Sequence, residues 1–572
     1  MKHKTWMGLL LAGLMLLTPL TACRNDNGPA QDSKTDPAAT DSATTEPETT
    51  PPDNQNIAFA VDGTVQYRFV YPDASGRLFQ TAANELAELL KSLVGDYPMI
   101  QKESLAELTD RPTVYLGYCR AAEAAGLTDG LAYNGYRMAE RDGDLYLVAA
   151  SGDALTAAVN LFKKSIRSGR SGKNISLDFP ERSNEVTSQA EKLPVFRTDG
   201  SVYGYATGAQ SYQMVYPNAE QSDFDAYLTQ LTEAGYTKRE ARSLPGVEYA
   251  AYGKEEDMLF VTLSCGELRV SYEPLSACWL EGTASAASAY PTTSYLMGVS
   301  LDSQNFENGM AMFYLLSDGT FLVFDGGHNE FDADNLYRHL CSIAEENGIA
   351  DLRISAWVIT HFHGDHVGAF EPFIRKYSDR VKVDHAVFGA TAADQGSAAT
   401  EGDSFFSKAQ GAMREYQPDA AIVRLHTGQL LTLGDMMVEV LYTPSDLPQG
   451  TLNNYNDASM ILRLKVSGKT VLMTGDAATA TWNLMVKKYG SYLKSDCLQV
   501  PHHGVNPGGT VEAYDLIAPD ELFWPAGNQL YSDLLATMNP AICKHLTAMV
   551  KPECIHIAGT LGKLTSFRFG AQ

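Results

Sequence analysis

Basic side chains are scarce in this chain. It has 44 lysines and arginines against 69 aspartates and glutamates, and its formal net charge is −25 at pH 7. Proteins hold phosphate backbones through many Lys and Arg contacts, so this deficit argues against nucleic acid as a tight partner. The apolar stretch at residues 6–17 is also shorter than the roughly 20 residues that a membrane-spanning helix needs. That stretch is therefore not expected to cross a bilayer.

Closely spaced cysteines are missing as well. The chain has 8 cysteines without C-x-x-C spacing, and those that follow Cys23 are odd in number, so they cannot all form disulfides. The sequence does not decide whether Cys543 and Cys554, or Cys265 and Cys278, form a disulfide in an extracytoplasmic setting. Most of the other cysteines are expected to be small buried hydrophobic residues.

The length of 572 residues allows three or four domains with large cores. The pattern of apolar, polar and low-complexity stretches divides the chain into residues 1–23, 24–56, 57–183, 195–275 and 290–572. No repeat with a period of roughly 20 to 50 residues is visible. Strands and helices alternate through the last three regions, which predicts the α/β class.

The N-terminus is expected to be a targeting segment. Lys2 and Lys4 precede the apolar residues 6–17, and residues 20–23 (LTAC) end in a cysteine. This ending resembles the lipobox of bacterial lipoproteins, which implies that Cys23 is acylated and anchors an extracytoplasmic protein to the bacterial cell membrane. An ordinary secretory signal with a chance cysteine is the alternative. Residues 24–56 have almost no large apolar side chain, so we expect a disordered acidic linker.

Two small α/β domains are expected next. The element order in residues 57–183 resembles the small non-catalytic domain that precedes the catalytic barrel in several glycoside hydrolases. This resemblance implies contact with cell-wall glycan, and a simple spacer is the alternative. Residues 195–275 contain a predicted helix with Ser222 as its N-cap, ending before Gly235. The aromatic side chains of this region predict a packed core.

Four potential metal ligands lie within seven residues in the second half of the chain. Residues 360–366 (THFHGDH) follow an apolar run at 354–359 that predicts a buried strand. Three imidazoles and a carboxylate suit zinc and its first-row neighbours. Gly364 allows a tight loop that brings them to one point. A polar turn with a surface histidine is the alternative, but it would not need this many donors.

These residues resemble the H-x-H-x-D-H motif of the metallo-β-lactamase-fold hydrolases. The resemblance extends to residues 321–327 (FLVFDGG), 456–459 (NDAS), 471–476 (VLMTGD) and 498–504 (LQVPHHG). Together they are most similar to the hydrolase-like domain of ComEC-type DNA-uptake proteins. The resemblance implies that residues 290–572 form an αββα sandwich, the metallo-β-lactamase fold, preceded by the two small α/β domains.

The resemblance also implies a centre of two divalent metal ions, with zinc favoured and manganese as the alternative. The implied ligands are His361 and His363 for the first ion, Asp365 and His366 for the second, Asp476 as the bridge, and one of His502 and His503 to complete the second site. Such ions lie roughly 3.5 to 4 Å apart and share a hydroxide. Asp365 is the expected catalytic residue, because it would orient the attacking water and pass a proton.

One ligand of the usual set is missing. The family places a third histidine for the first ion just after a strand that corresponds to residues 438–442, and the loop that follows here contains none. Asp457 or Asn454 could substitute, although either would bind more weakly than an imidazole. Asp325 and His328, in the first motif, are candidates for a metal contact or for a place behind the ligands.

Other departures concern the substrate. Val505 stands where the ComEC-like branch usually has a serine, and the later His-Pro pair of that branch is absent. The substrate is therefore expected to differ from the norm of the branch. We expect a structural place for His426, and an exposed or capping place on its helix for His339.

The sequence therefore predicts a membrane-anchored, extracytoplasmic, metal-dependent hydrolase. A phosphoester or phosphodiester is the favoured substrate, because phosphoryl oxygens suit a pair of cations. One alternative is the hydrolysis of a lactone, thioester or amide. Another is a cell-envelope glycan-binding surface lipoprotein whose metal domain is only weakly active. The substrate, the physiological metal and the oligomeric state do not follow from the sequence.

Overall fold

The structure of the protein is a computed structural model. It describes residues 56–73, 76–106, 111–187, 189–197, 202–208, 210–279, 283–284, 289–301, 308–389, 399–447, 452 and 454–569. The predicted signal segment with Cys23, and the linker up to residue 55, lie outside the described residues. Among the helices within these ranges, none has both the length and the apolar character that crossing a bilayer requires.

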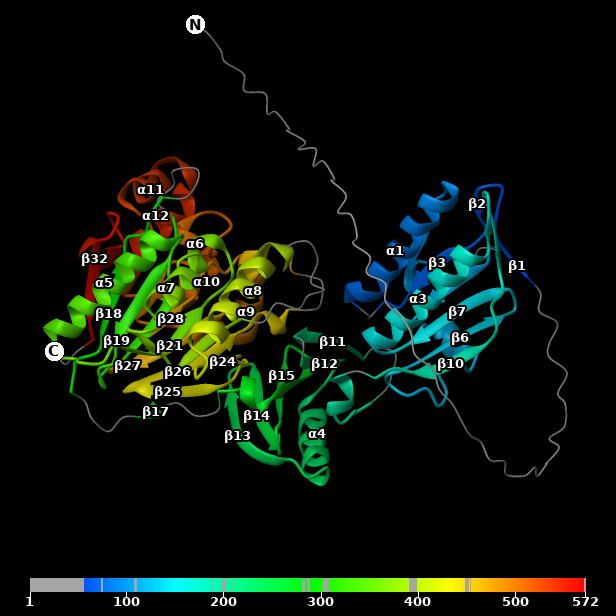
Figure 1. The fold of residues 1–572 in the computed structure, drawn as a ribbon, viewed down its shortest axis with the longest axis horizontal. Helices are drawn as coiled ribbons and strands as arrows, with labels where there is room; N and C mark the ends of the chain where they lie inside the picture. The colour runs from blue at the N-terminus through cyan, green and yellow to red at the C-terminus, as the bar shows by residue number, and fades with distance from the viewer. Residues whose placement is uncertain are drawn as a thin grey trace, which may run out of the picture. The chain divides into compact units, whose positions relative to one another are not determined.

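The first described region contains two sheets and two long helices. The six-stranded sheet has the order β10 (Arg182–Glu185), β6 (Gly135–Arg141), β7 (Asp144–Ala149), β5 (Thr113–Leu116), β3 (Arg68–Tyr71), β4 (Ile100–Lys102). The smaller sheet has the order β2 (Thr64–Val65), β1 (Ile57–Val61), β9 (Asn174–Leu177), β8 (Arg170–Ser171). The helices α1 (Gly76–Val94) and α3 (Gly152–Ser168) share one hydrophobic core with both sheets (Figure 1).

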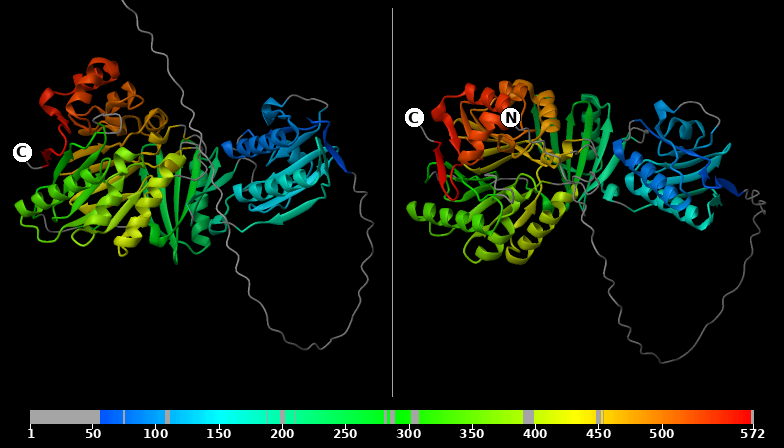
Figure 2. Two further views of the ribbon diagram at one scale, coloured as in Figure 1. Left: turned by 45° about the horizontal axis from the view of Figure 1, so that its top comes forward. Right: turned by 90° about the horizontal axis from the view of Figure 1, so that it is seen from above.

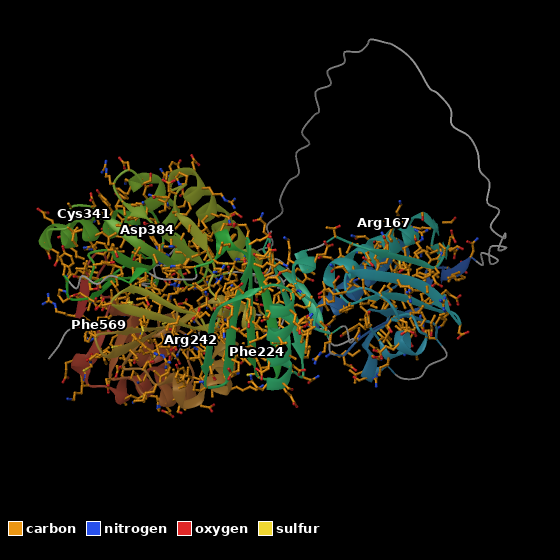
Figure 3. The ribbon with its side chains drawn as sticks, turned by 90° about the horizontal axis from the view of Figure 1, so that it is seen from below. Arg167, Phe224, Arg242, Cys341, Asp384 and Phe569 are labelled. Atoms are coloured by element: carbon orange, nitrogen blue, oxygen red, sulfur yellow. The ribbon has the colours of Figure 1, made fainter. Side chains whose placement is uncertain are left out.

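The second region is an antiparallel six-stranded sheet with one helix. Its strand order is β11 (Tyr203–Gly208), β12 (Ser211–Pro217), β16 (Glu267–Pro274), β15 (Asp257–Ser264), β14 (Val247–Lys254), β13 (Thr237–Leu244). The helix α4 (Gln221–Glu233) buries Phe224 in the core (Figure 3). Its N-cap is Glu220, so the prediction of Ser222 was wrong. The reason is that the Asp223 carboxylate accepts a hydrogen bond from the Glu220 amide at 2.8 Å, which closes the turn two residues earlier.

The last region contains two eight-stranded sheets. The first has the order β24 (Ala421–Val423), β23 (His385–Phe388), β21 (Arg353–Ile359), β20 (Phe321–Asp325), β19 (Ala311–Leu315), β18 (Thr293–Met297), β32 (Leu564–Arg568), with β22 (Lys382–Val383) beside β21. The second has the order β17 (Thr283–Ala284), β25 (Leu430–Gly434), β26 (Met436–Tyr442), β27 (Ile461–Val466), β28 (Lys469–Met473), β29 (Cys497–Gln499), β30 (Glu521–Trp524), β31 (Ile555–Ile557).

Alternating side chains pack these two sheets face to face. On β20, Leu322 and Phe324 belong to a core shared with Val438 and Val440 of the other sheet, because successive residues of a strand point to opposite faces. The opposite faces pack against α5 (Glu330–Glu346), α7 (Phe370–Tyr377), α9 (Thr479–Tyr489) and α10 (Val511–Ile517). Figure 2 shows the helices outside the sheets in two further views. The predicted αββα sandwich is confirmed.

The cysteines of the described residues are all free thiols. Neither pair that the sequence left open forms a disulfide: Cys265, Cys278, Cys543 and Cys554 are each unpaired. Cys341 lies on α5 (Figure 3). Three of the thiols are buried, as expected for small hydrophobic residues: Cys119, Cys497 and Cys543.

Candidate metal centre

The site is built on the ends of two neighbouring parallel strands. β20 pairs with β21 and ends at Asp325, whose backbone is left-handed with φ of +55°. The Asp325 carboxylate is fully buried and accepts hydrogen bonds from the amide and the hydroxyl of Thr360, both at 2.8 Å. The loop after β21 is therefore held against the end of β20, and this fixes the position of His361.

The same carboxylate sets the tautomer of His366. His366 Nδ1 lies 2.7 Å from Asp325 Oδ2, so a proton on Nδ1 leaves the lone pair of Nε2 free. A carboxylate behind a histidine commonly fixes the tautomer of a metal ligand and raises its basicity. The sequence allowed Asp325 to be either a metal ligand or a residue that supports one. The structure places it against Nδ1 of His366, so it supports a candidate ligand.

Four side chains from three loops converge on one point. Asp365 and His366 follow β21, Asp476 follows β28 and His503 follows β29, and one ligand atom of each lies within 4.8 Å of the others. His366 Nε2 is 3.1 Å from Asp476 Oδ2. His503 Nε2 is 3.2 Å from Asp365 Oδ2 and 3.4 Å from Asp476 Oδ2. We call these four residues the acid–histidine cluster.

This donor set fits a divalent cation. Nε2 of His366 and Nε2 of His503 are buried and face carboxylate oxygens at 3.1 and 3.2 Å, and Oδ1 of Asp476 is buried with no hydrogen-bond partner within the described part of the chain. Leaving a buried acceptor such as this Oδ1 unpaired costs about 1–3 kcal/mol, and a cation bound to it would remove that cost. Two imidazole nitrogens and two carboxylates are ligand types of zinc and of its first-row neighbours.

The charges of the cluster depend on one another. Burial lowers the pKa of His503, but Asp476 and Asp365 outweigh it and raise that pKa to about 9. Burial also opposes protonation of His366, whose pKa is nevertheless raised well above its usual value by Asp476, Asp365 and Asp325. Without metal, the charge of the aspartates therefore favours the protonated form of both rings. A metal ion has to displace these protons, so metal binding should weaken as the pH falls.

His361 and His363 form a pair beside the cluster. His361 Nε2 lies 2.9 Å from His363 Nδ1 and 4.0 Å from Asp476 Oδ2. Burial, together with the charge of His366, holds the pKa of His361 well below its usual value, so this ring is neutral. Asp476 is thus a member of the cluster that also lies near His361.

His502 lies outside the cluster, although it is next to His503 in the chain. Both residues have left-handed backbones, with φ of +51° and +53°, and their rings point to different partners. His502 Nε2 lies 3.1 Å from Asn456 Nδ2, whereas His503 Nδ1 lies 2.8 Å from the Pro525 carbonyl oxygen and its Nε2 faces the carboxylates. Of the two histidines that the sequence left open, the structure thus brings His503 to the other ligands.

The two proposed substitutes for the missing histidine contact backbone amides instead. Asp457 Oδ1 accepts a hydrogen bond from the Thr481 amide at 3.0 Å, in the first turn of α9. Asn454 Oδ1 accepts one from the Asn456 amide at 3.1 Å and caps a short 3-10 helix. Neither residue is brought into the acid–histidine cluster.

The other histidines have contacts of their own. His328 Nε2 lies 2.7 Å from the carbonyl oxygen of Asn308, whose side chain donates to Asp365. His426 is buried and stacks on Phe260 with ring centroids 3.9 Å apart, which agrees with a structural place. His339 lies in the middle of α5, is only partly exposed, and has its Nε2 2.9 Å from the Gly562 carbonyl oxygen, so the expected exposed or capping place was wrong.

Two residues at the site were not indicated by the sequence. Asn308 Nδ2 donates to Asp365 Oδ2 at 3.2 Å from a loop far away in the chain. Tyr455 packs its ring against His361 and His363. Asn308 belongs to no motif that we identified, whereas the position of Tyr455 in the loop without histidine was a signal that could have been used.

A protein-family model matches the region that carries this cluster. The metallo-beta-lactamase superfamily model matches residues 307–506, which include all of the clustered ligands. The chain therefore carries a metallo-β-lactamase superfamily domain with a candidate metal-binding cluster. None of the curated proteins compared with the chain matches it.

Solved structures give three further likenesses. A metallo-β-lactamase from Cronobacter sakazakii (Enterobacter sakazakii) covers 45% of this chain and 90% of its own, with 13% identity and a TM-score of 0.24. CmlA, a diiron β-hydroxylase from Streptomyces venezuelae, covers 52% and 55%, with 14% identity and a TM-score of 0.29. A long form RNase Z from yeast covers 50% and 43%, with 10% identity and a TM-score of 0.30.

Proposed function

We propose that the protein is a metal-dependent hydrolase that cleaves a phosphoester or phosphodiester. The observation that carries this proposal is the convergence of four ligand atoms from three loops within 4.8 Å, beside the His361–His363 pair. Divalent ions bound there would lower the pKa of a water molecule and polarise the oxygen of the scissile bond. A pair of cations suits phosphoryl oxygens, which favours this substrate class.

The two aspartates would have different tasks. The Asp365 side chain is 17% exposed, against 2% for Asp476, and its Oδ2 is oriented by the Asn308 amide. A carboxylate on the open side can orient the attacking water, accept its proton and pass that proton to the leaving group. The buried Asp476 is a member of the cluster that also lies near His361, and its charge would offset the repulsion of two cations.

Hydrolysis of a lactone, thioester or amide is the second candidate within the same class. Turnover of bis(p-nitrophenyl) phosphate, nitrocefin and a panel of lactones, with zinc or manganese added, separates the two. We expect the phosphodiester to be cleaved, and Asp476→Ala is the inactive control. Turnover of nitrocefin or a lactone alone would overturn the phosphoester proposal. Tight binding to isolated cell wall without any turnover would instead favour a glycan-binding surface protein.

We also propose that Cys23 carries lipid and holds the protein on the extracytoplasmic side of the bacterial cell membrane. The proposal is supported by the basic start, the apolar core and the LTAC ending of the first 23 residues. Stable anchoring requires more than one acyl chain, because a single chain binds membranes only marginally. On this proposal, the acidic linker keeps the catalytic domain off the membrane surface.

A further inference from the structure

The first metal position lacks the third histidine that the family has, and the ring of Tyr455 lies beside the two histidines that are present. The loop between β26 and β27 contains no histidine, and the Asp457 and Asn454 side chains bind backbone amides. Tyr455, in the same loop, has its ring centroid 5.1 Å from that of His363 and 6.1 Å from that of His361. We propose that Tyr455 is the third ligand of the first metal ion and binds it through the phenol oxygen.

The two histidines already point to a common spot. His361 Nε2 and His363 Nδ1 are 2.9 Å apart, and their ring centroids are 4.6 Å apart. Two nitrogens bound to one tetrahedral zinc ion at about 2.0–2.1 Å lie roughly 3.3 Å from each other. The observed spacing is close to that value, so one ion can contact both nitrogens after a small movement. The ring of Tyr455 packs against both imidazoles from the loop in which the family has its third histidine.

The loop holds this ring firmly. Tyr455 begins the short helix η5 (Tyr455–Ala458), is only 2% exposed, and has a buried phenol oxygen. The Tyr442 hydroxyl donates to the Asp457 carbonyl oxygen at 2.5 Å, and the Asp457 carboxylate is tied to the start of α9. These bonds hold the backbone of the loop in place, and the burial of the ring keeps the phenol oxygen away from solvent.

A phenol ligand would change the chemistry of the first position. On binding, the phenol O–H bond breaks, its proton goes to solvent, and an oxygen lone pair of the phenolate forms the bond to the metal. Imidazole binds as a neutral ligand, so this exchange adds one negative charge to the position. Anionic oxygen ligands suit harder ions, and tyrosinate is an established ligand of iron. The first position should therefore favour manganese or iron, relative to zinc, more than a site of three histidines would.

The inference rests on the proposed metal centre and not on which bond is cleaved. Metal-free protein is titrated with zinc while the ultraviolet tyrosinate band and the bound metal are measured. We expect the parent to bind two ions and to form one tyrosinate per chain. Tyr455→Phe should bind one ion without the band, and Tyr455→His should bind two ions without the band. Tyr227→Phe is the matched control, because it removes a buried tyrosine hydroxyl of α4 that contacts none of the candidate ligands, and it should leave both signals unchanged.

Several results would overturn the inference. One is a parent protein that binds two ions without forming tyrosinate. Another is a Tyr455→Phe variant that keeps both ions, because the phenol oxygen would then not be a ligand. A parent that binds one ion or none would mean that the ring fills the position. A lack of turnover on every substrate would count against the proposed hydrolase only, since the titration does not depend on catalysis.

Discussion

Replacing Asp325 by asparagine should weaken metal binding without touching any ligand. In the parent, Asp325 accepts bonds from both donors of Thr360 and from His366 Nδ1, at 2.7 to 2.8 Å. An asparagine that still accepts the Thr360 amide bond turns its NH₂ group toward His366. The imidazole then has to accept at Nδ1 and carry its proton on Nε2, the atom that faces the cluster. Loss of such a partner typically costs 10- to 100-fold in metal affinity, or about 1.4–2.7 kcal/mol.

Asp332→Asn is the matched control for this effect. Asp332 is equally buried and accepts bonds from the Ser300 amide and hydroxyl and from the His328 amide, at 2.7 to 2.9 Å, but it contacts none of the candidate ligands. Both variants should lower the melting temperature of the metal-free protein, because each leaves buried donors poorly paired. Competition with a chromophoric chelator should show weaker binding only for Asp325→Asn. Equal affinities for the two variants would refute the role assigned to Asp325.

Three further predictions follow from the same geometry. Asp365→Asn should keep much of its metal but lose on the order of 10²-fold or more in kcat. Asp476→Ala should lose metal first and activity as a result. Elemental analysis and rate measurements on the same preparation distinguish the two outcomes. Asp457→Ala should keep its metal and lose about 1 kcal/mol of stability, because its carboxylate caps α9, and a missing metal equivalent would contradict this. Cys23→Ser should move the protein from the membrane fraction to the soluble fraction. Unchanged fractionation would contradict the proposal that Cys23 carries a lipid anchor.

Strand ends were the part of the site that the sequence could predict. The apolar run at 354–359 corresponds to β21, and the ligands at 361–366 follow it directly. Asp325 and Asp476 likewise lie at or shortly after the ends of β20 and β28. Parallel neighbours bring the carboxyl ends of strands to one edge of a sheet, so a polar residue at such an end has a predictable place.

Loop residues were not predictable in the same way. Tyr455 and Asn308 reach the site along loops whose paths depend on packing, so no local pattern places them. The choice between His502 and His503 depends on two successive left-handed residues that turn the rings apart. The carboxylate of Asp457 is a suitable metal ligand, but in the structure it accepts a hydrogen bond from the Thr481 amide in the first turn of α9. These contacts arise only when distant segments meet, and they are invisible to periodicity and spacing.

The candidate ligands belong to both sheets of the sandwich. The histidine-rich loop follows β21 of the first sheet, whereas Asp476 and His503 follow β28 and β29 of the second. A complete set of ligands therefore exists only after residues more than a hundred positions apart have been brought together by folding. A partly folded chain would remain inert, and so would a fragment that ends before residue 476. Metal binding would therefore stabilise the folded domain, because both sheets have to be in place to supply the ligands.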